Sequence, residues 1–125
     1  MKVKYFTPQE ANRRLPYISR IVNDLLEKGK NLQALTLLPH QTPELQKQQQ
    51  VLEEQIQTLM QELEDLGCYY KDWNFEIGLV DFPAIIHGQQ ALLCWRSDEA
   101  EVAWFHGYED GYAGRRPVTR ELIFS

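Results

Sequence analysis

The sequence has 125 residues, of which 43% are apolar and 25% charged, and its formal net charge is -5. This balance is typical of a globular protein and excludes a disordered tail, and a chain of this length buries roughly two thirds of its unfolded surface. Polar residues from Gln9 onward interrupt the N-terminal segment, so we expect neither a signal peptide nor a membrane span. The acidic balance, without a basic stripe longer than two arginines, argues against nucleic acid as a partner.

The chain has two cysteines, Cys68 and Cys94, and three histidines. The cysteines lack the paired spacing of a zinc-binding motif, and the histidines form no second ligand cluster. The sequence therefore predicts no metal site and no cofactor. Without an export signal we expect a cytoplasmic protein, in which both thiols stay reduced.

The first predicted helix begins at a capping box formed by Thr7 and Glu10. A proline lies in its first turn, where the missing N–H costs nothing. Pro16 then interrupts the helical pattern. We therefore expect a short helix over 8–14, kinked or restarted at Pro16, that continues to about Leu38.

The second predicted helix begins at Thr42 and Pro43, which repeat the start signal, and ends at Gly67, which can take the left-handed conformation. A heptad-like apolar stripe runs along it: Leu45, Leu52, Ile56, Leu59, Leu63 and Leu66. A short connection makes the two helices antiparallel. We interpret the stripe first as the internal core of this helical hairpin, with a coiled coil to a partner as the alternative.

Residues 67–125 differ from the first half in composition and favour a sheet. They contain eleven of the fourteen aromatic residues, and the net charge is -1 before Gly67 and -4 from Gly67 onward. Four short segments have strand character, with a turn at His87-Gly88: CYYK, IGLVDF, QALLCWR and EVAWFH. We predict an α+β protein of one domain (1–125), a long antiparallel helical hairpin (1–66) packed on a small, mainly antiparallel sheet with a C-terminal loop.

A four-residue loop over 97–100 would join the last two strands into a hairpin. This loop places Arg96 opposite Glu101 and Cys94 opposite Ala103. Both faces of such a sheet carry apolar residues, so the sheet needs two covers. The helical hairpin supplies one cover. We expect the C-terminal tail or a second subunit to supply the other, which favours a homodimer.

Five short motifs occur in order along the chain: YFTPQEANRRLP, GLVDFPA, LLCWR, EVAWFH and GYAGRRP. Together they resemble an uncharacterised bacterial family known as domain of unknown function 2203, over a stretch that runs from Tyr5 to Pro117. The family pattern has Gly-Glu after the Cys-Trp-Arg motif, where this chain has Ser97-Asp98-Glu99. The resemblance implies a bacterial cytoplasmic protein and brings no catalytic role for any residue.

Asp81 stands between apolar neighbours, where an ionised carboxylate costs several kcal/mol unless it is paired. Arg96, Arg115 or a backbone turn could supply its partner. We interpret Asp81 first as a structural carboxylate and second as a catalytic one, because structural ion pairs perturb carboxylates as active sites do. Cys94 is interpreted as a buried apolar residue rather than a nucleophile.

The segment around the GYAGRRP motif has the residue types of a ligand site. His106, Glu109 and Asp110 could bind a divalent cation on a helix, but the glycines beside them favour a loop. Arg115 and Arg116 have planar guanidinium groups that suit a carboxylate or a phosphate. The alternative is a structural role, in which the arginines pair with acidic residues of the same half of the chain. We prefer this structural interpretation to a ligand site.

The sequence contains no complete catalytic set, and the predicted sheet has more apolar surface than one helical hairpin covers. It therefore predicts a soluble, non-enzymatic binding or protein-interaction module that is homo-oligomeric. The alternative is an enzyme or ligand-binding protein that acts on a small anionic molecule through six residues: Asp81, Arg96, His106, Glu109, Arg115 and Arg116.

Overall fold

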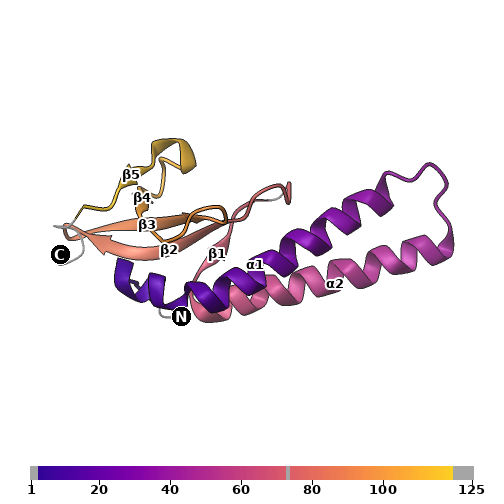
Figure 1. The fold of residues 1–125 in the computed structure, drawn as a ribbon, viewed down its shortest axis with the longest axis horizontal. Helices are drawn as coiled ribbons and strands as arrows, with labels where there is room; N and C mark the ends of the chain where they lie inside the picture. Colours follow the sequence, from indigo (N-terminus) through magenta and orange to yellow (C-terminus); the bar gives the residue numbers. More distant parts are fainter. Residues whose placement is uncertain (1–2, 73, 120–125) are drawn as a thin grey trace.

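The computed structural model describes residues 3–72 and 74–119 (Figure 1). The elements in chain order are α1 (Pro8–Thr36), α2 (Pro43–Leu66), β1 (Tyr69–Tyr70), β2 (Leu79–Ile86), β3 (Gln89–Arg96), β4 (Trp104–His106), the short 3-10 helix η1 (Tyr112–Gly114) and β5 (Arg116–Pro117). Within the described residues the strands form one antiparallel sheet in the order β1-β2-β3-β4-β5. The α+β prediction is confirmed.

Helix α1 begins where the capping signals place it, since the Thr7 hydroxyl accepts a hydrogen bond from the Glu10 N–H at 3.1 Å. Of the two outcomes expected at Pro16, the restart of the helix is wrong, because α1 continues through Pro16 as one helix to Thr36. Leu15 and Ile18, on either side of this proline, are both buried in the same core. Burial of these two side chains stabilises the helix by more than the loss of the one hydrogen bond that proline cannot make. The helix therefore continues through this position.

Helix α2 has the predicted limits. The Thr42 hydroxyl accepts from the Leu45 N–H at 3.1 Å, and Gly67 ends the helix with a left-handed φ of 96°. The two helices form an antiparallel hairpin, and the half that includes the connection between Thr36 and Pro43 extends well beyond the sheet (Figure 1).

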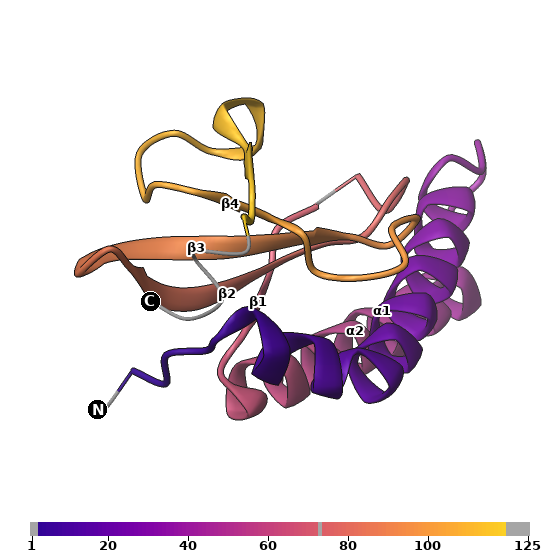
Figure 2. The same cartoon turned by 60° about the vertical axis from the view of Figure 1, so that its left-hand side comes forward.

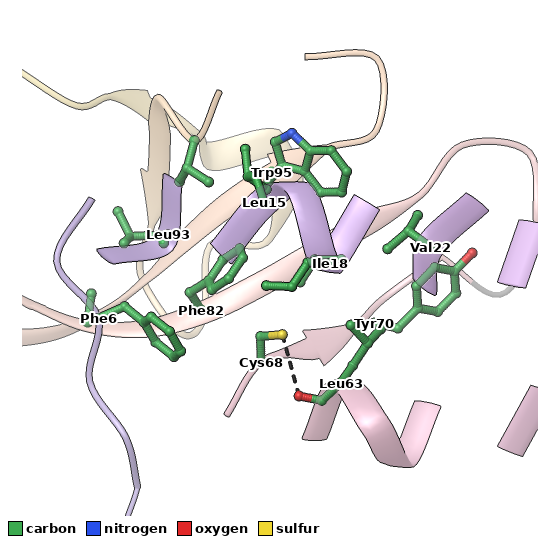
Figure 3. Packing of buried hydrophobic residues seen from close by; sticks show 14 of the residues in the cluster. Phe6, Leu15, Ile18, Val22, Leu63, Cys68, Tyr70, Phe82, Leu93 and Trp95 are labelled. Atoms are coloured by element: carbon green, nitrogen blue, oxygen red, sulfur yellow. Dashed lines mark hydrogen bonds between the residues drawn. The ribbon is translucent and has the colours of Figure 1, made fainter. Parts of the chain in front are cut away.

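One face of the sheet packs on the helical hairpin. Phe82 from β2 and Leu93 and Trp95 from β3 point to this side, where they meet buried residues of α1 such as Ile18 (Figure 3). Strands β2 and β3 are joined by the predicted two-residue turn at positions 87 and 88, which both have positive φ. The alternation of side chains along each strand sends the intervening residues to the opposite face.

The expected pairing between the third and fourth strands is wrong by one residue. Cys94 lies opposite Trp104 and not Ala103, and β4 begins only at Trp104. The reason is Asn12 of α1, whose side chain donates to the Val102 carbonyl at 3.2 Å and accepts from the Val102 N–H at 2.6 Å. These two bonds occupy the Val102 backbone and lengthen the loop. A slip of one residue reverses the faces, so His106 lies on the side away from the helices.

The C-terminal segment supplies the second cover. Between β4 and β5 the chain, with η1, lies on the other side of the sheet from α1 and α2 (Figure 2), and β5 then pairs with β4 at the edge of the sheet. The Arg115 guanidinium lies over the Trp104 ring at 4.9 Å, and the Val118 N–H donates to the Ala103 carbonyl at 2.8 Å. The predicted cover by the tail is therefore present in the described residues. Positions 120–125 lie outside the described residues.

Candidate functional site

Three polar side chains meet on the sheet face that the C-terminal segment covers. Asp81 of β2 lies directly opposite Cys94 of β3, and His106 at the end of β4 lies opposite Leu92. Asp81, Cys94 and His106 are only 5%, 1% and 4% exposed. Each residue offers one atom that could bind a metal: a carboxylate oxygen, the Sγ and a ring nitrogen. These three atoms all lie within 4.8 Å of one another.

The orientation of the His106 ring is set by its neighbour. Nδ1 lies 2.8 Å from the Gly107 carbonyl oxygen, and a carbonyl only accepts, so Nδ1 carries a proton. Nε2 lies 3.3 Å from Asp81 Oδ1. If Asp81 is ionised, its carboxylate accepts a hydrogen bond from a protonated Nε2. If Asp81 is protonated, its carboxyl group donates to an unprotonated Nε2. In either state one proton is shared between the two side chains.

Burial dominates the electrostatics of this cluster. It raises the pKa of Asp81 above its ordinary value, and this effect is opposed by the charges and hydrogen bonds of His106, Lys71 and Cys94. Burial and then the nearby Asp81 charge raise the pKa of Cys94 to about 12. The Cys94 thiol is therefore protonated at neutral pH, so it is not a ready nucleophile in this environment.

A pocket of about 320 Å³ opens above the three polar residues. This volume is near the lower end of the roughly 300–1,000 Å³ of small-molecule sites. Leu79 and Leu92 contribute apolar surface, while Lys71, Tyr108 and Tyr112 contribute an ammonium and two phenols. The pocket thus combines a buried polar group, apolar contacts and a positive charge.

Arg115 does not pair with Asp81. It contacts the loops beside the pocket instead. Its Nη2 lies 2.8 Å from both carboxylate oxygens of Glu99, and its guanidinium lies over the Tyr112 ring at 4.8 Å. Glu99 also accepts from the Arg96 backbone N–H at 2.7 Å. This arrangement connects the loop after β3 to the C-terminal segment.

The remaining predicted residues lie nearer the surface. Arg96 Nε forms a 2.6 Å ion pair with Asp98, and Arg116 lies 3.9 Å from the Asp110 carboxylate. Glu109 is exposed. Within the described residues, His106 is the one member of the predicted set that bonds to Asp81. The structure thus separates the six residues into one buried pair, three arginines with acidic partners and Glu109.

Sequence reasoning missed the place of Cys94 and Lys71 in this cluster. A usable signal existed for Cys94, because a two-residue turn at positions 87 and 88 pairs Ile86 with Gln89 and, counted back along both strands, Asp81 with Cys94. Lys71 had no such signal, since it follows a strand of only two residues.

These features define a class: α+β proteins in which a helical hairpin covers one sheet face and a C-terminal loop closes a polar pocket on the other. The family model described as uncharacterized conserved protein, DUF2203, matches residues 4–118. The chain therefore belongs to this family, which confirms the resemblance seen in the motifs. No curated protein and no solved structure matches the chain significantly. Within the described residues, each helix is too short or too polar to cross a membrane.

Proposed function

We propose that this protein is a small-molecule-binding module and that the pocket above Asp81, Cys94 and His106 is its site. The observation that carries the proposal is the buried Asp81–His106 pair at 3.3 Å, which lines the pocket instead of being sealed in the core. A polar pair that is costly to bury and is left beside a cavity is a feature of functional sites.

The surroundings of the pocket favour a small carboxylate as ligand. Lys71 forms no ion pair within the described part of the chain, whereas each of the three arginines faces an acidic side chain. Tyr112 accepts a 2.6 Å hydrogen bond from Arg96, so its own O–H is free to donate. A ligand carboxylate can therefore bind to Lys71 and Tyr112 while its apolar part contacts Leu79 and Leu92.

The test is a titration of the full chain with a panel of small carboxylic acids and phosphate monoesters, followed by amide NMR. We expect a carboxylate to shift the signals of Cys94, His106 and Tyr108 in a saturable way. Lys71→Met should weaken binding about tenfold, the loss of one charged contact. Lys30→Met, an exposed lysine on α1, is the control and should bind as the wild type does. Equal binding by both variants, or no saturable shift with any compound, would refute the proposal.

A second candidate function is self-association through the helical hairpin, which would give the homo-oligomer and coiled-coil character expected from the sequence. Leu37 is 82% and Val51 46% exposed on the part that extends beyond the sheet. A groove of about 770 Å³ runs beside Val51 between the helices. Both Glu44 and Lys47 border the groove. A second copy related by a two-fold axis can therefore place its lysine near the glutamate of the first copy, and its glutamate near the lysine.

Light scattering over a range of concentrations tests self-association. We expect a dimer that Val51→Glu converts to monomer, because the substitution places a charge in the apolar groove. Ile85→Glu, at a site of similar exposure on the sheet, should leave the dimer intact. A wild-type monomer at all concentrations would exclude this candidate without affecting the pocket.

We further propose that the protein acts as a single domain in the cytoplasm. The two halves share one core, in which residues of α1 and of β2 pack together. Both cysteines are buried and free, the state that thiols keep in a reducing compartment.

A further inference from the structure

We propose that Asp81, Cys94 and His106 bind one Zn²⁺ ion, with a fourth coordination position open to the pocket. The inference deepens the proposed function and rests on it for the nature of the fourth ligand. The sequence predicted no metal, because the three residues lie far apart along the chain and only the sheet register brings them together.

The three side chains have the atoms and the spacing for this ion. Zinc bonds of about 2.0–2.3 Å place tetrahedral ligand atoms about 3.3–3.7 Å from one another. His106 Nε2 and Asp81 Oδ1 are already 3.3 Å apart, and all three ligand atoms lie within 4.8 Å. Movements on the order of 1 Å would therefore bring the three atoms to the spacing of zinc ligands.

The surroundings of His106 match those of a metal ligand. In zinc sites the histidine nitrogen that does not bind the metal donates to a carboxylate or a backbone carbonyl, which fixes the ring. Here Nδ1 donates to the Gly107 carbonyl at 2.8 Å, so Nε2 is directed toward Asp81. The turn that positions this carbonyl is closed by the Asp110 N–H, which donates to the same oxygen at 3.2 Å.

The charges of the site balance when zinc is bound. Coordination releases the Cys94 thiol proton and the proton shared by Asp81 and His106 to solvent. The thiolate and the carboxylate then offset the two positive charges of the ion, with a neutral imidazole as third ligand. A cluster this deeply buried would tolerate no large net charge. The one described cation that lines the pocket is Lys71, which favours an anion at the fourth position.

The donor set also indicates what the metal would do. Nitrogen, oxygen and sulfur ligands together suit a borderline ion such as Zn²⁺ better than Mg²⁺ or Ca²⁺. Three protein ligands and an open position are the arrangement of zinc sites that bind substrate or water. The pocket therefore fits a small carboxylate that coordinates the metal and extends between Leu79 and Leu92.

The experiment is a titration of the metal-free full chain with Co²⁺, which reports a bound thiolate through a sulfur-to-cobalt charge-transfer band in the near ultraviolet. We expect one Co²⁺ per chain, a band that Zn²⁺ abolishes by displacing Co²⁺, and a higher melting temperature with Zn²⁺. Cys94→Ser should remove the band, and His106→Gln, which removes a direct ligand, should weaken binding by at least about 100-fold. Circular dichroism confirms that each variant is folded.

Cys68→Ser is the matched control. Cys68 is also buried, but its thiol donates to the Leu63 carbonyl in the core at 3.4 Å, a bond that a serine hydroxyl can replace (Figure 3). This variant should bind Co²⁺ with the wild-type band. A band that survives in Cys94→Ser, or no binding of Co²⁺ and Zn²⁺ by wild type, would overturn the metal site.

The two proposals fail separately. Carboxylate binding by the metal-free protein, without any Zn²⁺ binding, would leave the small-molecule pocket standing and refute the metal. Zinc binding without a carboxylate response, in either the metal-free or the zinc-loaded protein, would refute the proposed ligand class and support the metal alone.

Discussion

The two faces of the sheet are built from the same strands and differ completely in chemistry. On the helix side Phe82 and Leu93 are fully buried among apolar neighbours. One position earlier on β2 and one later on β3, Asp81 and Cys94 point to the loop side and meet His106. The period of two along a strand thus lets eight-residue strands carry a core and a polar site at once.

The comparison teaches that the kind of cover determines what a sheet face can hold. Two long helices bring enough apolar surface to bury large side chains, so their face stabilises the fold. A loop brings backbone groups and a few side chains such as Tyr108 and Tyr112, and it leaves a pocket. We therefore expect substitutions on the helix side to change stability and those on the loop side to change binding.

The largest effect is expected from Phe82→Ala. The ring is fully buried and packs edge-on against Phe6, with centroids 5.2 Å apart. Its loss should lower the free energy of unfolding by about 3–5 kcal/mol, which urea denaturation measures. On the other face Leu79→Ala should cost only about 1 kcal/mol, because this side chain is partly exposed. Similar costs for both would remove the distinction between the faces.

Asp81→Ala should cost less than Phe82→Ala although Asp81 is also buried. It leaves His106 without a hydrogen bond at Nε2 and removes the acceptor of the Cys94 thiol, a loss of about 1–3 kcal/mol. Asp81→Asn keeps a polar group in place and should cost less than half as much. Denaturation of the metal-free variants checks both values. A loss for Asp81→Ala as large as that for Phe82→Ala would mean that the polar face also carries the stability of the fold.

Gly29→Ala tests the helical cover itself. A Cβ atom at this position would overlap the Phe75 ring, which packs on α1 there. Overpacking costs about 1–3 kcal/mol, whereas alanine gains about 1 kcal/mol of helix propensity. We expect a net loss of about 1 kcal/mol in thermal denaturation. In a Phe75→Ala background the same substitution should stabilise the protein, and a loss in that background would contradict the packing explanation.

The smallest effect is a pH dependence from Cys68 on the helix side. Burial raises the pKa of its thiol from 9.0 to about 12, so the native state holds the proton more tightly than the unfolded state. The free energy of unfolding should therefore fall as pH rises from about 9 to 12, with a loss of about 0.8 kcal/mol by pH 9.5. Denaturation at several pH values checks this, and Cys68→Ala should have a shallower slope. Equal slopes would show that other groups cause the alkaline loss.

The helices could be predicted from the sequence because their signals are local. Thr42 and Gly67 mark the ends of α2 by the chemistry of single residues at its two caps. The turn at His87-Gly88 is local as well, and it was enough to find β2 and β3. The length of α1 was harder, because Pro16 is a strong local signal that burial of its neighbours overrides.

The candidate site could be predicted only as separate residues. Asp81 and His106 stand out by type and surroundings, but their meeting depends on the register of β4, which Asn12 sets from the other half of the chain. For the arginines, an acidic partner could be predicted, but not which acidic residue it would be. Arg115 had several possible acidic partners in this half, and nothing local showed that the chosen one would be Glu99.

The contact between Asn12 and Val102 spans 90 residues of chain and has a consequence for the order of folding. The register of β4 depends on this contact, so we expect β4 to take its final place only once α1 has docked on the sheet. Contacts of such high sequence separation form slowly, since the intervening loop must close first. We therefore expect the polar pocket to be among the last parts of the molecule to be completed, after the helices have formed.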